Sequence, residues 1–205
     1  MATNIALKRA RKAQRRKQVV AEKRRAEALD ASLSARVLRA AGMPIQHCFL
    51  TESLFDIGMG NLVVARGATP HHLAFSSFLI DVFCLGIKDV TFESMEGEVF
   101  DLYLDVMDAA SPMAPADPSY ARKLLCDLAA WSRSIGFAPH RDFAAVEPVF
   151  GDVNANASGA VFRFGRDGRP VYIPGPNDAA SVVQRRIEHL KRHLGDDGFS
   201  FDTAA

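Results

Sequence analysis

HLAFSSFLIDVFCLG, from His72 to Gly86, is the stretch that decides the fold. Apolar residues occupy odd and even positions alike between Leu73 and Cys84, and aromatic and β-branched side chains are frequent among them. This pattern is typical of a strand that is buried on both faces, and Gly86 favours a turn after it. We therefore expect the central strand of a sheet over Leu73–Cys84.

Three shorter stretches with β-forming residues flank this strand. They are HCFLTES (His47–Ser53), GNLVVAR (Gly60–Arg66) and IKDVTFES (Ile87–Ser94). Turns are expected between them at Gly58-Met59-Gly60, at Gly67–His71 and at Gly86. Short strands joined in this way predict an antiparallel meander.

Two helices are expected after the meander. Val99–Ala109 has its large apolar residues on one helical side, and the Pro-, Ala- and Ser-rich residues 111–118 predict a loop. Asp117 then suits an N-cap and Pro118 the first helical position, in a helix that ends at Gly136. The apolar stripe of this second helix consists of Leu124, Leu125, Leu128, Trp131 and Ile135.

The C-terminal part predicts a hairpin and a further helix. VFRFGRDGRPVYIPG (Val161–Gly175) is typical of two strands joined across Asp167-Gly168, a dipeptide that favours tight turns. The following helix has Asn177 or Asp178 as its cap and ends at Gly195. The predicted fold class is therefore α+β, an antiparallel sheet of meander plus C-terminal hairpin packed with helices. We expect residues 43–205 to form a single domain.

Residues 1–42 are predicted to be a basic helical arm in front of that domain. From Asn4 to Ala41 there is no Gly or Pro and helix-forming residues dominate, while Gly42 and Pro44 favour an end to the helix. The second half of this helix is expected to dock on the core. Its apolar stripe consists of Leu29, Leu33, Val37 and Leu38.

The arm holds most of the positive charge of a protein that is otherwise acidic. Residues 1–28 contain ten lysines and arginines against two glutamates, a formal charge of +8. The other residues include 15 basic and 22 acidic side chains, a formal charge of −7. Such a division favours a polyanionic partner for the basic segment. The residues expected to bind it are Lys8, Arg9, Arg11, Lys12, Arg15, Arg16, Lys17, Lys23, Arg24 and Arg25.

Composition limits the class of protein further. With 205 residues and 48% hydrophobic content, the chain can bury a substantial core. No apolar run approaches the roughly 18 residues of a membrane span, and no signal-peptide pattern follows the basic start. The three widely spaced cysteines favour reduced, buried thiols over disulfides or a zinc site. We expect a cytoplasmic protein without a metal or cofactor.

Three phrases resemble a family of bacterial hypothetical proteins. They are FLIDVFCLGIKD (Phe78–Asp89), SIGFAPHRDF (Ser134–Phe143) and FGRDGRPVYIPGPND (Phe164–Asp178). The resemblance covers about residues 50–194 and implies a shared fold, with no activity to carry over. Some members of that family have a small cysteine-rich zinc-binding tail of the type found on SecA. This chain has no Cys-x-Cys pattern at its end, so the resemblance implies no zinc or SecA-type role here.

Asp81 is the first candidate for chemistry, because an unpaired carboxylate inside an apolar run is costly to bury. Lys88, Arg66 or an imidazole could supply its partner. With Asp89 it could form a metal or acid–base pair. The alternative is a structural carboxylate that ends a strand face or holds a salt bridge.

Cys84 and His140 are the other candidates. Cys84 could be a nucleophile with His71, His72 or His140 as its base, or a packed core residue between Phe83 and Leu85. His140 stands two residues before Asp142, so it could be an oriented base or a hydrogen-bond donor that fixes its loop.

Three further polar groups could bind anions. The Gly175–Asp178 segment precedes a helix whose first N–H groups could hold an anion, unless Asp178 caps them. Two basic clusters could extend the surface that the arm offers to a polyanion. They are Arg163, Arg166 and Arg169 on the hairpin, and Arg185, Arg186, Lys191 and Arg192 on the last helix.

The charge division predicts a non-enzymatic, RNA- or ribosome-associated protein. Its basic helix would pair with backbone phosphates and release their counterions. A membrane surface fits less well, because the face of the predicted helix opposite the cations offers alanine rather than bulky apolar residues. Two alternatives stay open: a small hydrolase with a site around Asp81, Asp89 and His140, and a protein–protein adaptor with an acidic partner.

Overall fold

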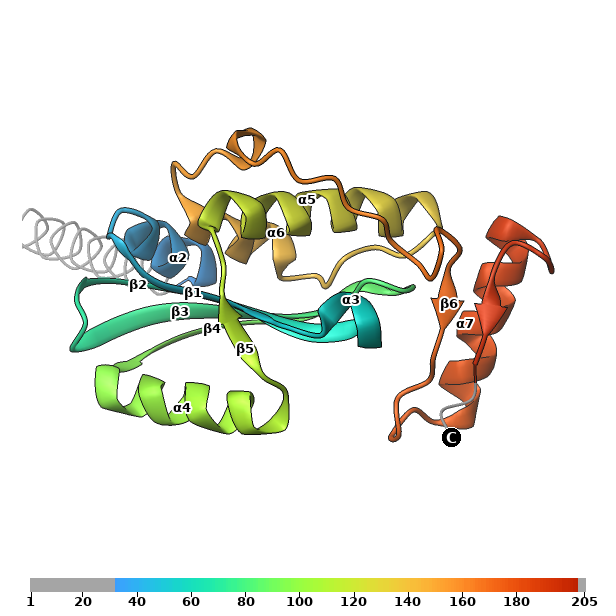
Figure 1. The fold of residues 1–205 in the computed structure, drawn as a ribbon, viewed down its shortest axis with the longest axis horizontal. Coiled ribbons are helices and arrows are strands. Elements are labelled where there is room, and N and C mark those ends of the chain that lie inside the picture. The colour runs from blue at the N-terminus through green and yellow to red at the C-terminus, as the bar shows by residue number, and fades with distance from the viewer. Residues whose placement is uncertain (1–31, 203–205) are drawn as a thin grey trace, which may run out of the picture.

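The structure, a computed structural model, describes residues 32–202. Its centre is a five-stranded antiparallel sheet in the order β4-β3-β2-β1-β5, with helices on both faces (Figure 1). The strands are β1 (Ile45–Thr51), β2 (Met59–Thr69), β3 (His72–Asp81), β4 (Gly86–Glu96) and β5 (Met113–Pro115). The α+β class and the antiparallel meander are therefore confirmed.

Side-chain alternation along β2 and β3 explains why both sheet faces are covered. Successive residues of a strand point to opposite faces. Val64 and Phe78 belong to the large core cluster under α2, α5 and α6, whereas Val63 and Phe75 belong to the cluster under α4. The central strands are thus apolar on both sides, as the sequence pattern predicts.

The helices differ in length and in the face that they cover. α2, α5 and α6 lie on one face of the sheet, α4 lies on the other, and α7 stands beyond one end (Figure 1). The helices are α2 (Leu33–Ala41), α3 (Leu54–Ile57), α4 (Gly97–Ala110), α5 (Pro118–Ser134), α6 (Phe143–Val146) and α7 (Ala180–Leu194), with the 3₁₀ turns η1 (Glu147–Phe150) and η2 (Ala155–Ala157).

Helix α5 begins where local sequence chemistry predicts. The Asp117 carboxylate accepts hydrogen bonds from the N–H groups of Ser119 and Tyr120 at 2.8 and 3.0 Å, and Pro118 is the first helical residue. Gly136 follows the helix with φ +94°, a backbone conformation that favours glycine. This helix is confirmed from cap to stop.

Helix α2 is the described end of the predicted arm. Ser32 has an extended backbone, its side chain accepts a hydrogen bond from the Ala35 N–H, and Gly42 ends the helix. Val37 is fully buried, but Leu38 is 61% exposed and does not belong to the docking face. Residues 1–31, which carry the rest of the predicted arm, lie outside the described part of the chain.

Three expected turns and loops differ from the structure. The helix α3 stands between β1 and β2, and Met59 already belongs to β2. β2 continues through Gly67 to Thr69, so the next turn is shorter than expected. The predicted loop over residues 111–118 contains β5, which pairs with β1 across a long stretch of intervening sequence.

The prediction of a C-terminal hairpin is wrong, although the turn at its centre forms. Arg166 and Arg169 make an isolated bridge around Asp167-Gly168, but no ladder continues from it. Instead the Gly165 N–H donates to Val82 O and the Val171 N–H to Phe83 O. The two flanking segments are therefore bonded to the turn after β3 and not to each other.

The strand β6 (Val171–Tyr172) pairs in parallel with β7 (Ser200–Phe201) beside α7. Buried residues of this end form a separate cluster, and Trp131 packs against both this cluster and the large core. The cluster consists of Cys84, Leu85, Ile135, Tyr172, Leu190 and Phe199. It attaches the C-terminal elements to α5 and to the turn after β3.

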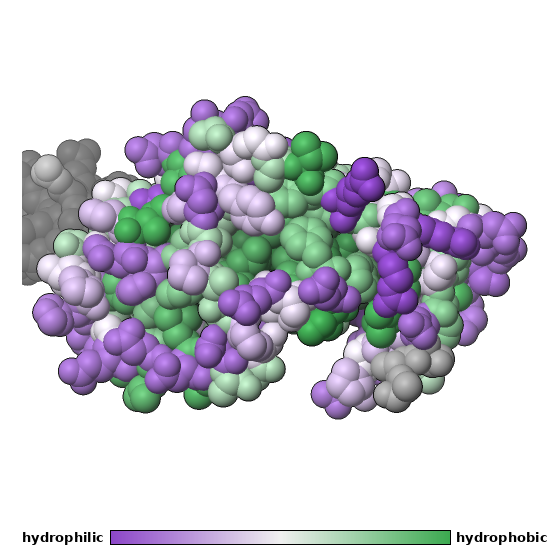
Figure 2. Space-filling view, viewed as in Figure 1, coloured by the Kyte–Doolittle hydropathy of each residue, from purple (hydrophilic) through white to green (hydrophobic). Residues whose placement is uncertain are grey.

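The outer side of α4 mixes apolar and acidic residues. Val99, Leu102 and Val106 are 49%, 65% and 71% exposed, and Figure 2 shows separate hydrophobic side chains among hydrophilic ones along the lower edge, where α4 lies. Within residues 32–202 no helix combines the length and apolarity needed to span a membrane.

Arg66 joins three elements from inside the large core. It lies on β2, is 3% exposed, and donates from its two terminal nitrogens to Met43 O after α2 and to Phe150 O of η1. Its Nε has no hydrogen-bond partner among the described residues. Burial lowers the pKa of this guanidinium, while the nearby Asp152 opposes the shift.

Gly151 is required where the chain passes Arg66. Its φ is +58°, and a Cβ there would lie 2.7 Å from Ala41 O and 3.0 Å from the Arg66 guanidinium. A side chain at this position would push η1 away from α2.

Replacing Arg66 tests whether its hydrogen bonds hold α2 and η1 against the sheet. We expect Arg66→Ala to lower the free energy of unfolding by roughly 3 kcal/mol, because a buried carbonyl and a partly buried one lose charged donors. Urea unfolding followed by circular dichroism measures the change. The exposed Arg133 of α5 provides a control, since Arg133→Ala should change stability by no more than about 0.5 kcal/mol. Equal stability of the two variants would contradict the assignment.

Candidate functional site

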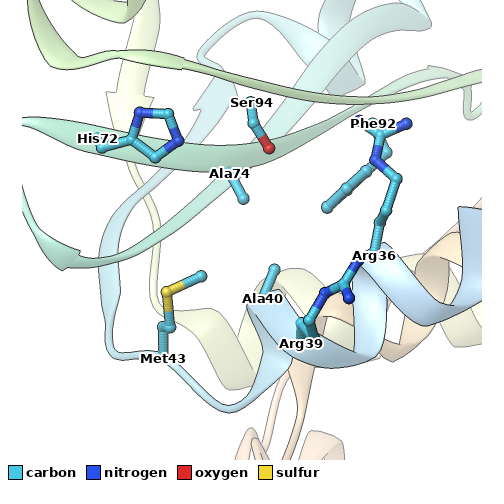
Figure 3. Close-up of a pocket in the computed structure, with 8 residues that line it drawn as sticks. All are labelled: Arg36, Arg39, Ala40, Met43, His72, Ala74, Phe92 and Ser94. Atoms are coloured by element: carbon cyan, nitrogen blue, oxygen red, sulfur yellow. The ribbon is translucent and has the colours of Figure 1, made fainter. Parts of the chain in front are cut away.

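A groove between α2 and the sheet gathers basic and apolar side chains. It has a volume of about 520 Å³, and the labelled side chains of Figure 3 enter it from α2 on one side and from β3 and β4 on the other. We call it the basic groove. Its lining residues are Arg36, Arg39, Ala40, Met43, His72, Ala74, Phe92 and Ser94.

Helix geometry and the sheet edge position the groove. Arg36 and Arg39 are three residues apart on α2, so both project on the same side of the helix. The Arg36 guanidinium lies 5.2 Å from the centroid of the Phe92 ring, within cation–π range. The buried Val37 and Ala40 pack α2 against the core, and Ala40 also lines the groove.

This arrangement suits a ligand that is anionic in one part and flat or apolar in another. The guanidinium groups can donate to phosphate or carboxylate oxygens, and Met43, Ala74 and Phe92 provide an apolar wall. One acidic group stands near the wall, since Glu96 Oε1 is 3.4 Å from His72 Nδ1.

Sequence reasoning did not identify Arg36 and Arg39 as site residues. Two arginines spaced three apart on a docking helix could have suggested a basic helical face. Their proximity to Phe92 depends on how α2 crosses the sheet, which the local sequence does not specify. The ten expected nucleic-acid-binding residues, Lys8 to Arg25, lie outside the described residues.

Asp81 ends β3 and turns the chain. Its carboxylate is 4% exposed and accepts hydrogen bonds of 2.9 Å from the N–H groups of Phe83 and Cys84. These bonds explain why β3 stops at Asp81 and not at Cys84 as expected. Among residues 32–202 no salt bridge involves Asp81, so its direct partners are backbone N–H groups. Of the partners predicted for it, Lys88 acts on the carboxylate only through its charge, which lowers the pKa against the effect of burial.

Cys84 lies within the turn and is fully buried. Burial raises the pKa of its thiol, with the Asp81 carboxylate adding to the shift. No hydrogen bond joins its sulfur to a histidine in the described part of the chain. This environment disfavours a thiolate. All three cysteines are free, and Cys126 is exposed, so the expectation of buried thiols is wrong for that residue.

His140 and Asp89 come together, whereas Asp81 is held in its turn. His140 Nε2 is 3.7 Å from Asp89 Oδ1, and Nδ1 faces the Asp142 N–H at 3.4 Å. The imidazole therefore contacts the end of its own loop and the strand β4 at once. Of the three residues of the expected hydrolase site, Asp89 and His140 form a pair, whereas Asp81 accepts hydrogen bonds from backbone N–H groups.

The other expected anion sites are largely used by the protein itself. Asp178 accepts a hydrogen bond of 2.9 Å from the Gly175 N–H, and an ion pair of 2.6 Å joins it to Arg186. Asp178 is therefore a turn residue, and neither it nor Asn177 caps α7, which follows Ala179 without a side-chain cap. The Gly175 hydrogen bond holds the pKa of the Asp178 carboxyl below its usual range, and Arg186 adds to this.

The two supplementary basic clusters are also partly engaged. Arg169 donates to the carbonyls of Asp197 and Phe199, and Lys191 pairs with Asp196 at 2.9 Å. Arg163 and Arg185 are exposed. Among residues 32–202 no group of three or more His, Cys, Asp or Glu side chains could hold a metal ion.

Comparison with known proteins gives no relative for this chain. No protein-family model matches it, and no curated protein or solved structure matches it either.

Asp81 can be tested as a backbone-bonding residue. We expect Asp81→Ala to lower the free energy of unfolding by about 2 kcal/mol, because buried N–H groups lose their acceptor. Asp81→Asn should cost much less, since its Oδ1 still accepts.

The pH dependence of unfolding gives a second check on Asp81. Burial raises the pKa of its carboxyl, against the hydrogen bonds from Cys84, Leu85 and Phe83 that lower it. The folded state therefore holds the Asp81 proton more tightly than the unfolded state, and this contribution to stability falls as pH rises from the unfolded pKa through the folded one. Asp81→Asn should remove that fall in urea titrations at several pH values. An unchanged pH profile would contradict this reading.

Proposed function

We propose that this protein binds RNA, free or within a ribosome, through its basic N-terminal segment together with the basic groove, and that it acts without catalysing a reaction. The supporting observation is the continuity of positive charge. The segment with a formal charge of +8 ends four residues before α2 begins, and α2 places Arg36 and Arg39 in the groove.

The binding energy would come mainly from phosphates. Each phosphate that pairs with Lys or Arg releases condensed counterions, so affinity falls steeply as salt rises. Phosphate contacts position a protein on RNA but carry no sequence information. The proposal therefore includes weak sequence preference.

The groove would add a preference for unpaired nucleotides. Single-stranded RNA is recognised where bases can leave the helix and pack on aromatic or guanidinium planes. Arg36 over Phe92 offers a guanidinium plane and an aromatic wall in one place, and Ala74 and Met43 add apolar surface further along the groove. A phosphate on Arg39 and a base against this wall would occupy the two chemical halves of the groove.

The acidic remainder of the protein supports the same assignment. Residues 29–205 have a formal charge of −7, so most of the folded surface repels a polyanion. Repulsion elsewhere would confine RNA to the basic segment and the groove.

The other two functions have less support. The hydrolase hypothesis keeps the Asp89–His140 pair but has Asp81 bonded to backbone N–H groups. An adaptor with an acidic partner would use the same cations as RNA, so competition separates them: polyglutamate would displace that partner, and RNA would not be bound.

The basic segment is tested by removing charge at matched positions. A triple variant tests this, with Gln in place of Arg11, Arg15 and Arg16. We expect it to bind RNA more weakly and to reduce the slope of log K against log salt by about 2, because each lost phosphate contact removes roughly 0.7 released counterion. Fluorescence anisotropy with a labelled single-stranded RNA at several salt concentrations measures both quantities. The control changes Arg133 and Arg141 to Gln, because both are exposed and neither belongs to the arm, to the groove or to the two basic clusters. Equal losses in the two variants would contradict the role of the segment.

The groove is tested by Arg36→Gln. We expect weaker binding to unpaired RNA and a smaller loss with duplex RNA of equal length, because the groove would hold an unpaired nucleotide. Arg133→Gln, at an exposed position of α5 outside the groove and the basic clusters, is the single-site control. A loss of the same size on both RNAs would show that Arg36 serves only as one more cation. Sedimentation of lysate with and without nuclease separates free RNA from ribosomes as the partner.

A further inference from the structure

A second pocket lies at the opposite end of the sheet from the groove, where β4, the segment after α5, and α7 meet. It has a volume of about 200 Å³. We call it the histidine pocket. Its lining residues are Leu85, Ile87, Lys88, Phe137, Ala138, His140 and Arg186.

Lys88 is a half-buried lysine of this pocket with few direct partners, although its charge acts on Asp81 and Asp178. Its ammonium carries three donors, yet its one hydrogen-bond acceptor among residues 32–202 is the Met59 thioether sulfur at 3.7 Å. A thioether is a weak acceptor. No carboxylate of the described residues lies within ion-pair distance of this ammonium.

Arg186 is fixed in place with donors to spare. Its Nη1 donates to Asp178 Oδ2 at 2.6 Å and to the Tyr172 hydroxyl at 3.2 Å. Its other nitrogens have no acceptor within the described part of the chain. A guanidinium oriented in this way presents its remaining N–H groups without losing further side-chain freedom.

His140 supplies a third nitrogen. Its Nδ1 accepts from the Asp142 N–H at 3.4 Å, so in the neutral ring the proton is on Nε2. Nε2 is 3.7 Å from Asp89 Oδ1, which is longer than a hydrogen bond. The Nε2–H group can therefore donate to a ligand while Asp89 supports the ring.

The charges around the pocket are arranged in two layers. No carboxylate belongs to its lining. Asp178 and Asp89 contact Arg186 and His140, and Asp142 lies beside the imidazole. Asp81 also acts electrostatically on Lys88, but its oxygens are bonded to the turn after β3. Lys88, His140 and Arg186 line the cavity, whereas the carboxylates that contact His140 and Arg186 lie outside its lining.

We propose that the histidine pocket binds a small molecule with a phosphate group. Lys88, His140 and Arg186 would donate to the phosphate oxygens, a combination of point charge, imidazole and planar guanidinium that suits this anion. Leu85, Ile87 and Phe137 would contact the organic part. The site is independent of the RNA proposal, since it shares no residue with the basic groove.

Such a ligand would also connect two parts of the fold. Lys88 lies on β4 and Arg186 on α7, so one phosphate would bridge the sheet and the C-terminal helix. Binding to the folded state alone raises stability with ligand concentration. The attachment of α7 should therefore strengthen when the pocket is filled.

The test uses the full chain with inorganic phosphate and phenyl phosphate as probes, and acetate as a second anion. Two-dimensional NMR at constant ionic strength follows the side-chain resonances of His140 and Arg186. We expect saturable shifts with both phosphate probes, tighter binding of phenyl phosphate, and a dissociation constant about tenfold higher for Lys88→Gln. The control Lys191→Gln, on the outer side of α7, should leave the constant unchanged.

Three results would overturn the proposal. One is the lack of saturable shifts in the unmodified protein, which needs no variant to interpret. Another is acetate binding as tightly as phosphate, which would remove the phosphate assignment. The third is an equal effect of Lys88→Gln and Lys191→Gln on the dissociation constant, which would mean that the shifts report only the general charge of the protein. Thermal unfolding without added anion confirms that both variants are folded.

Discussion

The position of α2 depends on one buried guanidinium. Arg66 reaches from the middle of the sheet to the carbonyls that follow α2 and close η1. Burying a charge without a carboxylate contact is tolerated only when it makes strong hydrogen bonds, so both segments must stay where their carbonyls meet it. Because α2 carries one wall of the basic groove, the shape of the groove is set from the core and not from the surface.

Charge is divided in space as well as along the sequence. Arg36 and Arg39 lie on α2, over one face of the sheet, whereas α4, on the other face, carries acidic residues and has no lysine or arginine. A polyanion would meet attraction on one side and repulsion on the other. The proposed RNA binding would therefore take place in one orientation, with the α4 face turned away from the RNA.

Sequence reasoning succeeded where the decisive chemistry is local and failed where it is not. Asp117 and Pro118 define the start of α5 within one helical turn. Apolar residues at both odd and even positions of β3 indicate that both faces of this strand are buried. The bond from Asp81 to the next two N–H groups is also local, but the apolar run continues past it and hides the turn. The strands β5 and β6 are short, and their partners are distant. The groove was missed for the same reason, since Arg36 meets Phe92 only after the sheet forms.

Trp131 gives the junction between the body and the C-terminal elements an optical label. It is the single tryptophan of the chain, it packs against both the large core and the α7 cluster, and its ring lies 5.3 Å from that of Phe164. Indole emission moves to longer wavelengths when water reaches the ring. Detachment of α7 would thus shift the emission of Trp131 to longer wavelengths while the sheet is still folded. The emission spectrum would then distinguish this partial opening from complete unfolding.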